Sequence, residues 1–206
     1  MNKNGASATF GHPIPFAGTT LPAKTTHVIF TFSDGSKLFY NDVRKFGWIK
    51  IIRTSEVAKL KIITEFGPEP LTSKFTEEKF KKTASASKSP IKTLLMDQKK
   101  IAGVGNIYAN EALFDAGIDP RRKAKKLSNE EIKKLYASIL KVLKEGIKYG
   151  GSSENAYVDA LGGRGKMQEH FKVYGKDGEK CPKCKGVIKR IALGGRGTFF
   201  CPKCQE

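Results

Sequence analysis

The stretch CPKCKGVIKRIALGGRGTFFCPKC, from Cys181 to Cys204, contains all 4 cysteines of the 206-residue chain. Their C-x2-C-x16-C-x2-C pattern falls within the spacing of zinc ribbons. Each C-x2-C turn can present two thiolates to one tetrahedral ion, and four sulfur ligands leave no open coordination position. The pattern therefore predicts one structural Zn2+ ion bound by Cys181, Cys184, Cys201 and Cys204. The alternative of two disulfides is disfavoured because the chain shows no signal peptide.

The segment between the two cysteine pairs predicts a β-hairpin. Residues 187–193 and 198–200 have the composition of short strands, with Gly194-Gly195-Arg196-Gly197 between them as the turn. A metal that fixes this hairpin also fixes Arg196 at its tip. A planar guanidinium at an exposed turn can bind a phosphate through two hydrogen bonds. A solvated turn residue fits the same pattern, so the spacing alone leaves the role of Arg196 open.

The charge of the chain points to a polyanionic partner. Lys and Arg number 38 against 20 Asp and Glu, and the net charge of +18 is spread along the whole sequence. A folded and strongly basic protein most often binds nucleic acid, although a ribosome-like or merely soluble basic surface has the same composition. No apolar run is long enough to span a membrane and no signal-peptide core is visible, so we expect a cytoplasmic protein without membrane contact.

The N-terminal part of the chain has the pattern of β structure. Residues 27–52 contain alternating apolar and polar side chains, and Asp34-Gly35 is a hairpin turn signal between the first two runs. Residues 46–52 predict a third strand. The segment GPEPLTS at 67–73 marks the end of this part.

Helical patterns follow this break. Pro90 suits the first turn of a helix over 91–98, and the clearest helix spans 128–149, where apolar residues repeat at helical spacing. Between them, Gly103-Val104-Gly105-Asn106 opens another helix. A helix N-terminus offers unpaired N–H groups and a partial positive charge, so this turn can bind a phosphate. An ordinary turn between packed helices fits equally well.

Several motifs together resemble one protein family. GVGNIYANEALFDAGIDP at 103–120 is similar to the helix–two-turn–helix signature of the formamidopyrimidine-DNA glycosylases and endonuclease VIII-like enzymes, and the cysteine-rich stretch with GRGTFFC is similar to their zinc finger. NDVRKFG, FGPEPL, KTLLMDQ, GGSS and VYGKDGEKC occur in the expected order. The resemblance covers about 27–206 and is closer to formamidopyrimidine-DNA glycosylase, because its relatives often lack the zinc ligands or the GPEPL-like link.

The resemblance implies an α+β, multi-domain fold. Residues 1–66 would be the C-terminal part of a catalytic β-sandwich whose N-terminal strands are missing, which leaves an exposed core edge. Residues 67–165 would be the helix–two-turn–helix DNA-binding domain, with a loop at about 152–167 that closes over the lesion. Residues 171–206 would form the zinc finger.

The resemblance also implies a partner and an activity. The partner is double-stranded DNA with an oxidised base or an abasic site, and the activity is removal of oxidised purines (formamidopyrimidine, 8-oxoguanine) in base-excision repair, with AP-lyase cleavage through a Schiff base. Arg196 would bind the phosphates flanking the lesion and assist a late elimination step, and Asn106, with Gly105, would bind the same backbone. Arg44 would face the orphaned base while Phe46 fills the stack.

The sequence also departs from the family pattern. A basic residue that the family places near Ser87 is found at Lys88, and a histidine usual in the family is replaced by Thr25. The family's nucleophile is an N-terminal proline followed by a glutamate, assisted by a lysine, whereas this sequence begins Met-Asn-Lys-Asn-Gly. We interpret this departure as a truncated gene model. We expect the chain as given to be inactive alone, and the full-length protein to be a monomer.

Two other function classes remain open. One is a non-catalytic module that recognises damaged DNA, and this class fits a sequence that lacks the family's nucleophile. The other is a zinc-ribbon RNA-binding protein, which explains the charge but not the order of Arg44, Asn106 and Arg196. Equal affinity for RNA and for abasic duplex DNA would favour the RNA-binding class.

Overall fold

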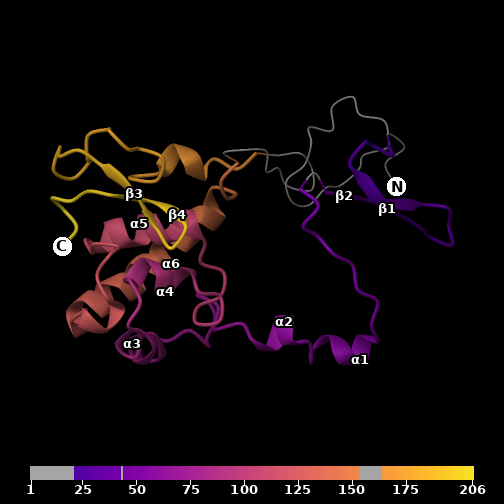
Figure 1. Cartoon of the computed structure of the whole chain (residues 1–206), viewed down its shortest axis with the longest axis horizontal. Coiled ribbons are helices and arrows are strands. Elements are labelled where there is room, and N and C mark those ends of the chain that lie inside the picture. Colours follow the sequence, from indigo (N-terminus) through magenta and orange to yellow (C-terminus); the bar gives the residue numbers. More distant parts are fainter. Residues whose placement is uncertain (1–20, 43, 154–163) are drawn as a thin grey trace.

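The computed structural model describes residues 21–42, 44–153 and 164–206. Figure 1 shows a β-hairpin at one end, an extended connecting segment, and a helical body that carries a second hairpin. No helix in these ranges is long and apolar enough to cross a lipid bilayer. The elements are β1 (Thr26–Thr31), β2 (Lys37–Asn41), α1 (Thr54–Val57), α2 (Lys61–Thr64), α3 (Glu77–Ser85), α4 (Ile91–Met96), α5 (Asn106–Ala116), η1 (Ala124–Lys126), α6 (Asn129–Lys148), η2 (Met167–His170), β3 (Lys189–Leu193) and β4 (Arg196–Phe200).

Strands β1 and β2 form the predicted first hairpin. They pair antiparallel with Phe30 opposite Leu38, and the Asp34 carboxylate closes the turn by accepting hydrogen bonds from the Ser36 N–H at 2.9 Å and hydroxyl at 2.6 Å. The predicted third strand is wrong, because residues 46–52 have no regular structure. A strand needs a neighbour for its N–H and C=O groups, and no third strand in the described ranges joins this sheet.

The apolar side chains of this N-terminal part are largely exposed. Ile51 is 94% exposed and Phe46 is 77% exposed. Apolar faces of this size normally pack against another layer of structure, so among the described residues the first hairpin and its connecting segment have no closed core of their own. The other exposed large apolar side chains in this part include Ile29, Phe30, Phe32, Leu38, Trp48, Ile49, Ile62, Ile63 and Phe66.

Helices α3 to α6 enclose the main core. Helix α6 begins as predicted, because the Ser128 hydroxyl accepts the Glu131 N–H at 3.2 Å and the Glu131 carboxylate accepts the Ser128 N–H at 2.7 Å. Helix α5 ends at Gly117, whose φ of 76° lies in the left-handed region that glycine adopts without strain. Helix α6 packs on α5 and α3. The core includes Phe80, Ile91, Leu95, Ile101, Leu113, Ile118, Ile132, Leu135 and Ile139.

A second core lies under the C-terminal hairpin. Strands β3 and β4 pair antiparallel, with Leu193 opposite Arg196 at the turn. The hairpin side chains meet Phe114 of α5, so that the finger rests on the helical body. The buried members of this cluster are Phe114, Val173, Cys181, Ile188, Phe199 and Cys201.

Glu111 of α5 ties the helical body to the chain that leads into the finger. Its side chain is buried, and its carboxylate accepts three backbone N–H groups, from Lys172 at 2.9 Å, Val173 at 3.0 Å and Tyr174 at 2.9 Å. Hydrogen bonds to an ionised acceptor are stronger than neutral ones. This carboxylate therefore fixes the start of the finger against α5.

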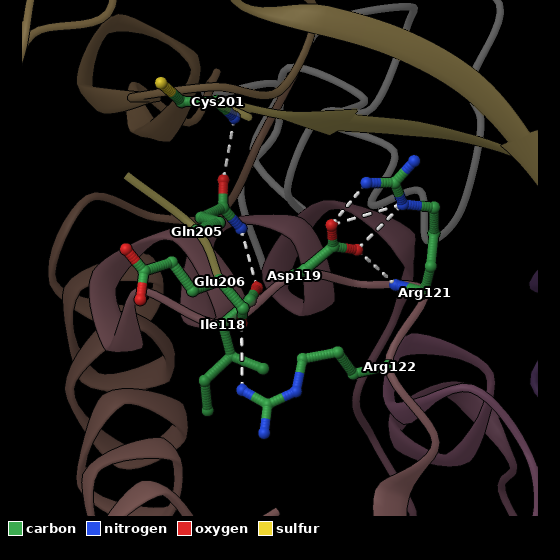
Figure 2. Close-up of polar contacts among 7 residues, drawn as sticks. All are labelled: Ile118, Asp119, Arg121, Arg122, Cys201, Gln205 and Glu206. Atoms are coloured by element: carbon green, nitrogen blue, oxygen red, sulfur yellow. Dashed lines mark hydrogen bonds and ion pairs between the residues drawn. The ribbon is translucent and has the colours of Figure 1, made fainter. Parts of the chain in front are cut away.

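The last residues of the chain make a second attachment, which Figure 2 shows. The Gln205 side chain accepts the Cys201 N–H at 2.9 Å and donates to the Ile118 carbonyl at 2.9 Å. The Glu206 carbonyl accepts the Arg122 guanidinium at 2.9 Å and the Asp119 N–H at 2.9 Å. The second cysteine pair is therefore anchored to the segment that follows α5.

Candidate nucleic-acid interface

The four cysteines of the finger form a structural zinc site. Their sulfur atoms all lie within 4.8 Å of one another, with 3.7 Å between Cys181 and Cys204 and 3.5 Å between Cys184 and Cys201. Four sulfurs at about 2.3 Å from one tetrahedral ion lie about 3.8 Å apart, so the arrangement fits Zn2+. With four protein ligands the ion has no place for water or substrate. The predicted zinc ligands are confirmed as one cluster.

The thiols of this cluster compete for negative charge. The hydrogen bond from Cys204 lowers the pKa of Cys184 to about 7, while the contact with Cys184 raises the pKa of Cys204. A bound dication removes this competition because it stabilises every thiolate at once. The chemistry of the donor set therefore also fits a metal.

The hairpin turn differs in detail from the sequence prediction. The turn consists of Gly194 and Gly195 alone, with φ values of 59° and 71°, and Arg196 is already the first residue of β4. A two-residue turn with positive φ at both positions matches the twist of a hairpin and suits Gly-Gly. Arg196 is exposed and follows this rigid turn, so its guanidinium is presented by a strand rather than by a loop.

The start of α5 is open to solvent, as a phosphate site requires. No side chain caps the helix, and its N-cap residue is Gly105. A Cβ built on Gly105 would meet nothing within 4 Å, so the space above this backbone is free. Asn106 lies directly after it, half-buried, and donates from Nδ2 to the Gly197 carbonyl at 3.2 Å.

The structure brings Asn106 to the residue after Arg196, and Lys92, which the sequence prediction missed, shares the same acceptor, the Gly197 carbonyl. Lys92 of α4 is 1% exposed, and its ammonium donates to the Gly197 carbonyl at 2.8 Å and to the Thr198 hydroxyl at 2.7 Å. The signal in the sequence is a single lysine inside the apolar run IKTLLM. Three elements, α4, α5 and β4, thus converge on one carbonyl oxygen beside Arg196.

Arg44 and Phe46 follow β2 in the sequence. Figure 1 shows the β1–β2 hairpin apart from the helical body. The Asp42 carboxylate accepts the backbone N–H groups of Arg44 at 3.0 Å, Lys45 at 2.9 Å and Gly47 at 2.7 Å, and these bonds, chiefly the one from Gly47, lower the Asp42 pKa. Both predicted side chains are exposed, and the Arg44 guanidinium lies 4.9 Å from the Phe46 ring centre. They project as a pair from one turn that Asp42 holds.

The sequence prediction also missed the role of Asp42. The signal that could have found it is an aspartate two to five residues before the N–H groups that it accepts, since aspartate side chains commonly hold turns in this way. A Cβ at Gly47 would overlap the Tyr40 hydroxyl, so any larger residue there would force the Tyr40 side chain to move.

Lys88 is exposed and precedes α4, and within the described ranges it makes no ion pair. Most of the predicted lesion-closing loop, residues 154–163, lies outside the described residues. Its two described ends meet, since the Met167 N–H donates to the Gly151 carbonyl at 3.0 Å.

A cavity of about 660 Å³ opens next to these loop ends. Its lining comes from the segment before α3, the start of α5, the end of α6 and the residues that lead into the loop. Apolar area dominates the lining, and Glu69 is an acidic residue among those that line it. The lining includes Glu69, Leu71, Ile107, Tyr108, Ile147 and Ser152.

Two family models match this chain. Residues 66–157 match the formamidopyrimidine-DNA glycosylase H2TH domain, and residues 178–206 match the zinc finger found in FPG and IleRS. The chain is 45% identical over 195 residues to a formamidopyrimidine-DNA glycosylase of Desulfitobacterium hafniense, covering 95% of this chain and 71% of the relative. It is 45% identical over 183 residues to that of Bacillus subtilis, covering 88% of this chain and 66% of the relative.

Solved structures agree with these sequence matches. The complex of Lactococcus lactis Fpg with DNA containing an abasic site superimposes with a TM-score of 0.80 at 43% identity, over 91% of this chain and 69% of that one. The MutM (Fpg) protein of Thermus thermophilus superimposes with a TM-score of 0.81 at 38% identity, over 89% of this chain and 70% of that one.

Proposed function

The chain belongs to the formamidopyrimidine-DNA glycosylase family, and we propose that it recognises duplex DNA with an abasic site or an oxidised base in base-excision repair. Its motifs and its α+β fold with a C-terminal finger had predicted this family. One observation carries this proposal: the exposed Arg196, the open start of α5 and Asn106 lie around a single carbonyl, that of Gly197. Cationic and N–H donors clustered in this way suit a phosphodiester backbone.

We propose that the helical body with its finger and the N-terminal part bind different features of the DNA. Arg196 and the first-turn N–H groups of α5 bind phosphates on either side of the lesion. Arg44 and Phe46 enter the duplex, where the ring replaces the stacking that an everted nucleotide loses and the guanidinium faces the orphaned base. The cavity beside the loop ends receives the everted base. These roles follow from exposure and residue chemistry, and the resemblance supports them.

We further propose that the family's lyase chemistry is separable from this recognition. That chemistry needs an amine that attacks C1′, forms a Schiff base and so allows β- and δ-elimination, and Arg196 would assist the last step. The sequence of these 206 residues contains no counterpart of the family's N-terminal Pro-Glu pair or of the assisting lysine. We therefore expect these 206 residues to bind damaged DNA without becoming attached to it.

Binding and trapping on the same DNA test these proposals. Fluorescence anisotropy should give a lower Kd for duplex DNA with an abasic site than for the intact duplex, and a lower Kd than for RNA of the same sequence. Equal Kd values for all three would refute damage recognition and favour the RNA-binding class. Borohydride should yield no covalent adduct, and an adduct would refute the separation of recognition from chemistry.

The assembly and location of the protein remain proposals. We propose a bacterial cytoplasmic protein that acts on the nucleoid and is monomeric when full length. The helical body and the finger have closed cores, whereas most of the exposed large apolar side chains lie in the N-terminal part. Sedimentation of the full-length protein should give one monomer mass, and a stable dimer would contradict the proposal.

A further inference from the structure

Lys92 is a buried cation without an acidic partner. Its side chain is 1% exposed, and among the described residues no carboxylate forms an ion pair with it. A buried ammonium is costly unless it is hydrogen-bonded and its charge is compensated. The two oxygens that it contacts, Gly197 O and Thr198 Oγ1, are neutral. The hydrogen bonds are therefore supplied, but a negative charge is not.

The charged neighbour of Lys92 increases this imbalance. Burial, with a smaller contribution from the positive charge of Arg196, lowers the pKa of Lys92 to about 8. The groups that α5 contributes here, Asn106 and Asn110, carry no charge, and Thr93 is the next residue of α4 itself. Two cations thus face one another across the start of β4, which is the surface proposed for a DNA phosphate.

The contacts of Lys92 also determine how the finger meets the helices. The carbonyl of Gly197 accepts both Lys92 Nζ and Asn106 Nδ2, and the Thr198 hydroxyl that accepts from Lys92 donates to the Arg196 carbonyl at 3.2 Å. Loss of the ammonium would remove two of the bonds that hold this strand start against α4 and α5. The orientation of Arg196 relative to Asn106 would then be less fixed.

We infer that Lys92 is a positioning residue of the DNA-backbone site, which joins the start of β4 to α4 and α5 and becomes charge-compensated when a phosphate binds at Arg196. The inference rests on the proposed function. It adds Lys92 to the DNA-backbone site and adds the uptake of one proton to DNA binding. A phosphate near two cations favours the protonated form of Lys92, so binding takes up a proton in the pH range where the free protein has lost it. DNA affinity should therefore fall as the pH rises through about 8.

The experiment is a pH series of DNA affinity with matched variants. The Kd for abasic-site duplex is measured by anisotropy from pH 6.5 to 9.5 at constant salt, for the wild type, Lys92→Met, Lys92→Gln and the control Lys133→Met, which removes a charge from an exposed position of α6. Zinc content and circular dichroism establish that each variant is folded.

The expected result is a wild-type Kd that rises by up to about tenfold between pH 7 and pH 9, the limit for one linked proton whose pKa in the free protein is about 8. Lys133→Met should follow the wild type. Both Lys92 variants should bind about ten- to a hundredfold more weakly at pH 7, as for loss of a charge-assisted contact, and lack the extra rise. The N-terminal amine titrates in the same range but is common to all four proteins, so the difference isolates Lys92.

Three results would overturn the inference. A wild-type Kd that is constant from pH 7 to pH 9 excludes proton linkage even if Lys92→Met does not fold. A folded Lys92→Gln variant with the wild-type pH profile excludes Lys92 as the linked group. Absence of binding to abasic-site DNA at pH 7 would refute the proposed function, and this inference with it.

Discussion

Replacement of Glu111 by Gln tests whether one buried carboxylate holds the finger to the helical body. In the wild type, Oε2 accepts the Lys172 N–H, and Oε1 accepts those of Val173 and Tyr174. Glutamine has nearly the same shape but keeps one acceptor oxygen, and its amide nitrogen would face a backbone donor. At least one charge-assisted bond, worth about 1.5–3 kcal/mol, is lost, and a buried N–H is left without an acceptor. We expect the free energy of unfolding to fall by about 2–4 kcal/mol.

Urea unfolding followed by far-UV circular dichroism, in buffer with excess Zn2+, measures this loss. The control is Glu130→Gln, an exposed residue in the first turn of α6, which should cost only about 0.5 kcal/mol through its interaction with the helix dipole. The affinity for abasic-site DNA should fall as well, because the finger that carries Arg196 is less firmly attached. A Glu111→Gln variant as stable as the control would refute the role assigned to this carboxylate.

Three further perturbations have clear expected outcomes. Arg196→Ala should weaken binding to abasic-site DNA by about 1–3 kcal/mol, whereas Lys189→Ala, an exposed position on the paired strand, should change it less; equal effects would remove Arg196 from the phosphate site. Removal of Zn2+ by a strong chelator should unfold the finger and abolish DNA binding while α6 stays helical, and retained affinity would contradict the role of the finger. The hydrogen bond from Arg122 lowers the pKa of Glu131 below its usual 4.5, so the ionised carboxylate stabilises the fold above pH 4.5 by on the order of 0.5–1 kcal/mol at this partly exposed site. This contribution is lost as the pH falls through the folded-state pKa. Glu131→Gln should therefore flatten the profile of unfolding free energy against pH below pH 4.5, and an unchanged profile would show that the pair contributes nothing.

The sequence was sufficient for features that depend on local spacing. Two C-x2-C turns are enough to predict four thiolates around one ion, because each turn is closed by its own backbone. The capping box of α6 and the glycine end of α5 are likewise local, since their hydrogen bonds join residues a few positions apart. The first hairpin follows from the Asp34-Gly35 turn for the same reason.

Predictions that needed a partner far away in the chain were less successful. Residues 46–52 have the composition of a strand but form none in the structure, since strand formation depends on a neighbour that composition does not supply. The turn of the finger hairpin was predicted as Gly194-Gly195-Arg196-Gly197 but consists of Gly194 and Gly195 alone, because the pairing of Leu193 with Arg196 starts β4 two residues earlier than expected. The roles of Arg44, Phe46, Lys88, Gly105, Asn106 and Arg196 in DNA binding remain predictions.

By itself, the sequence determined the zinc ligands, the main helices, the basic character and the family, because each is encoded in contiguous residues or in their order. Only the tertiary structure decided what surrounds Arg196. Lys92 is one lysine among many in the sequence, and Glu111 is one of two acidic residues of α5. Burial makes them different, because a charged group removed from water must be satisfied by specific partners, and here those partners lie about a hundred residues away for Lys92 and about sixty for Glu111.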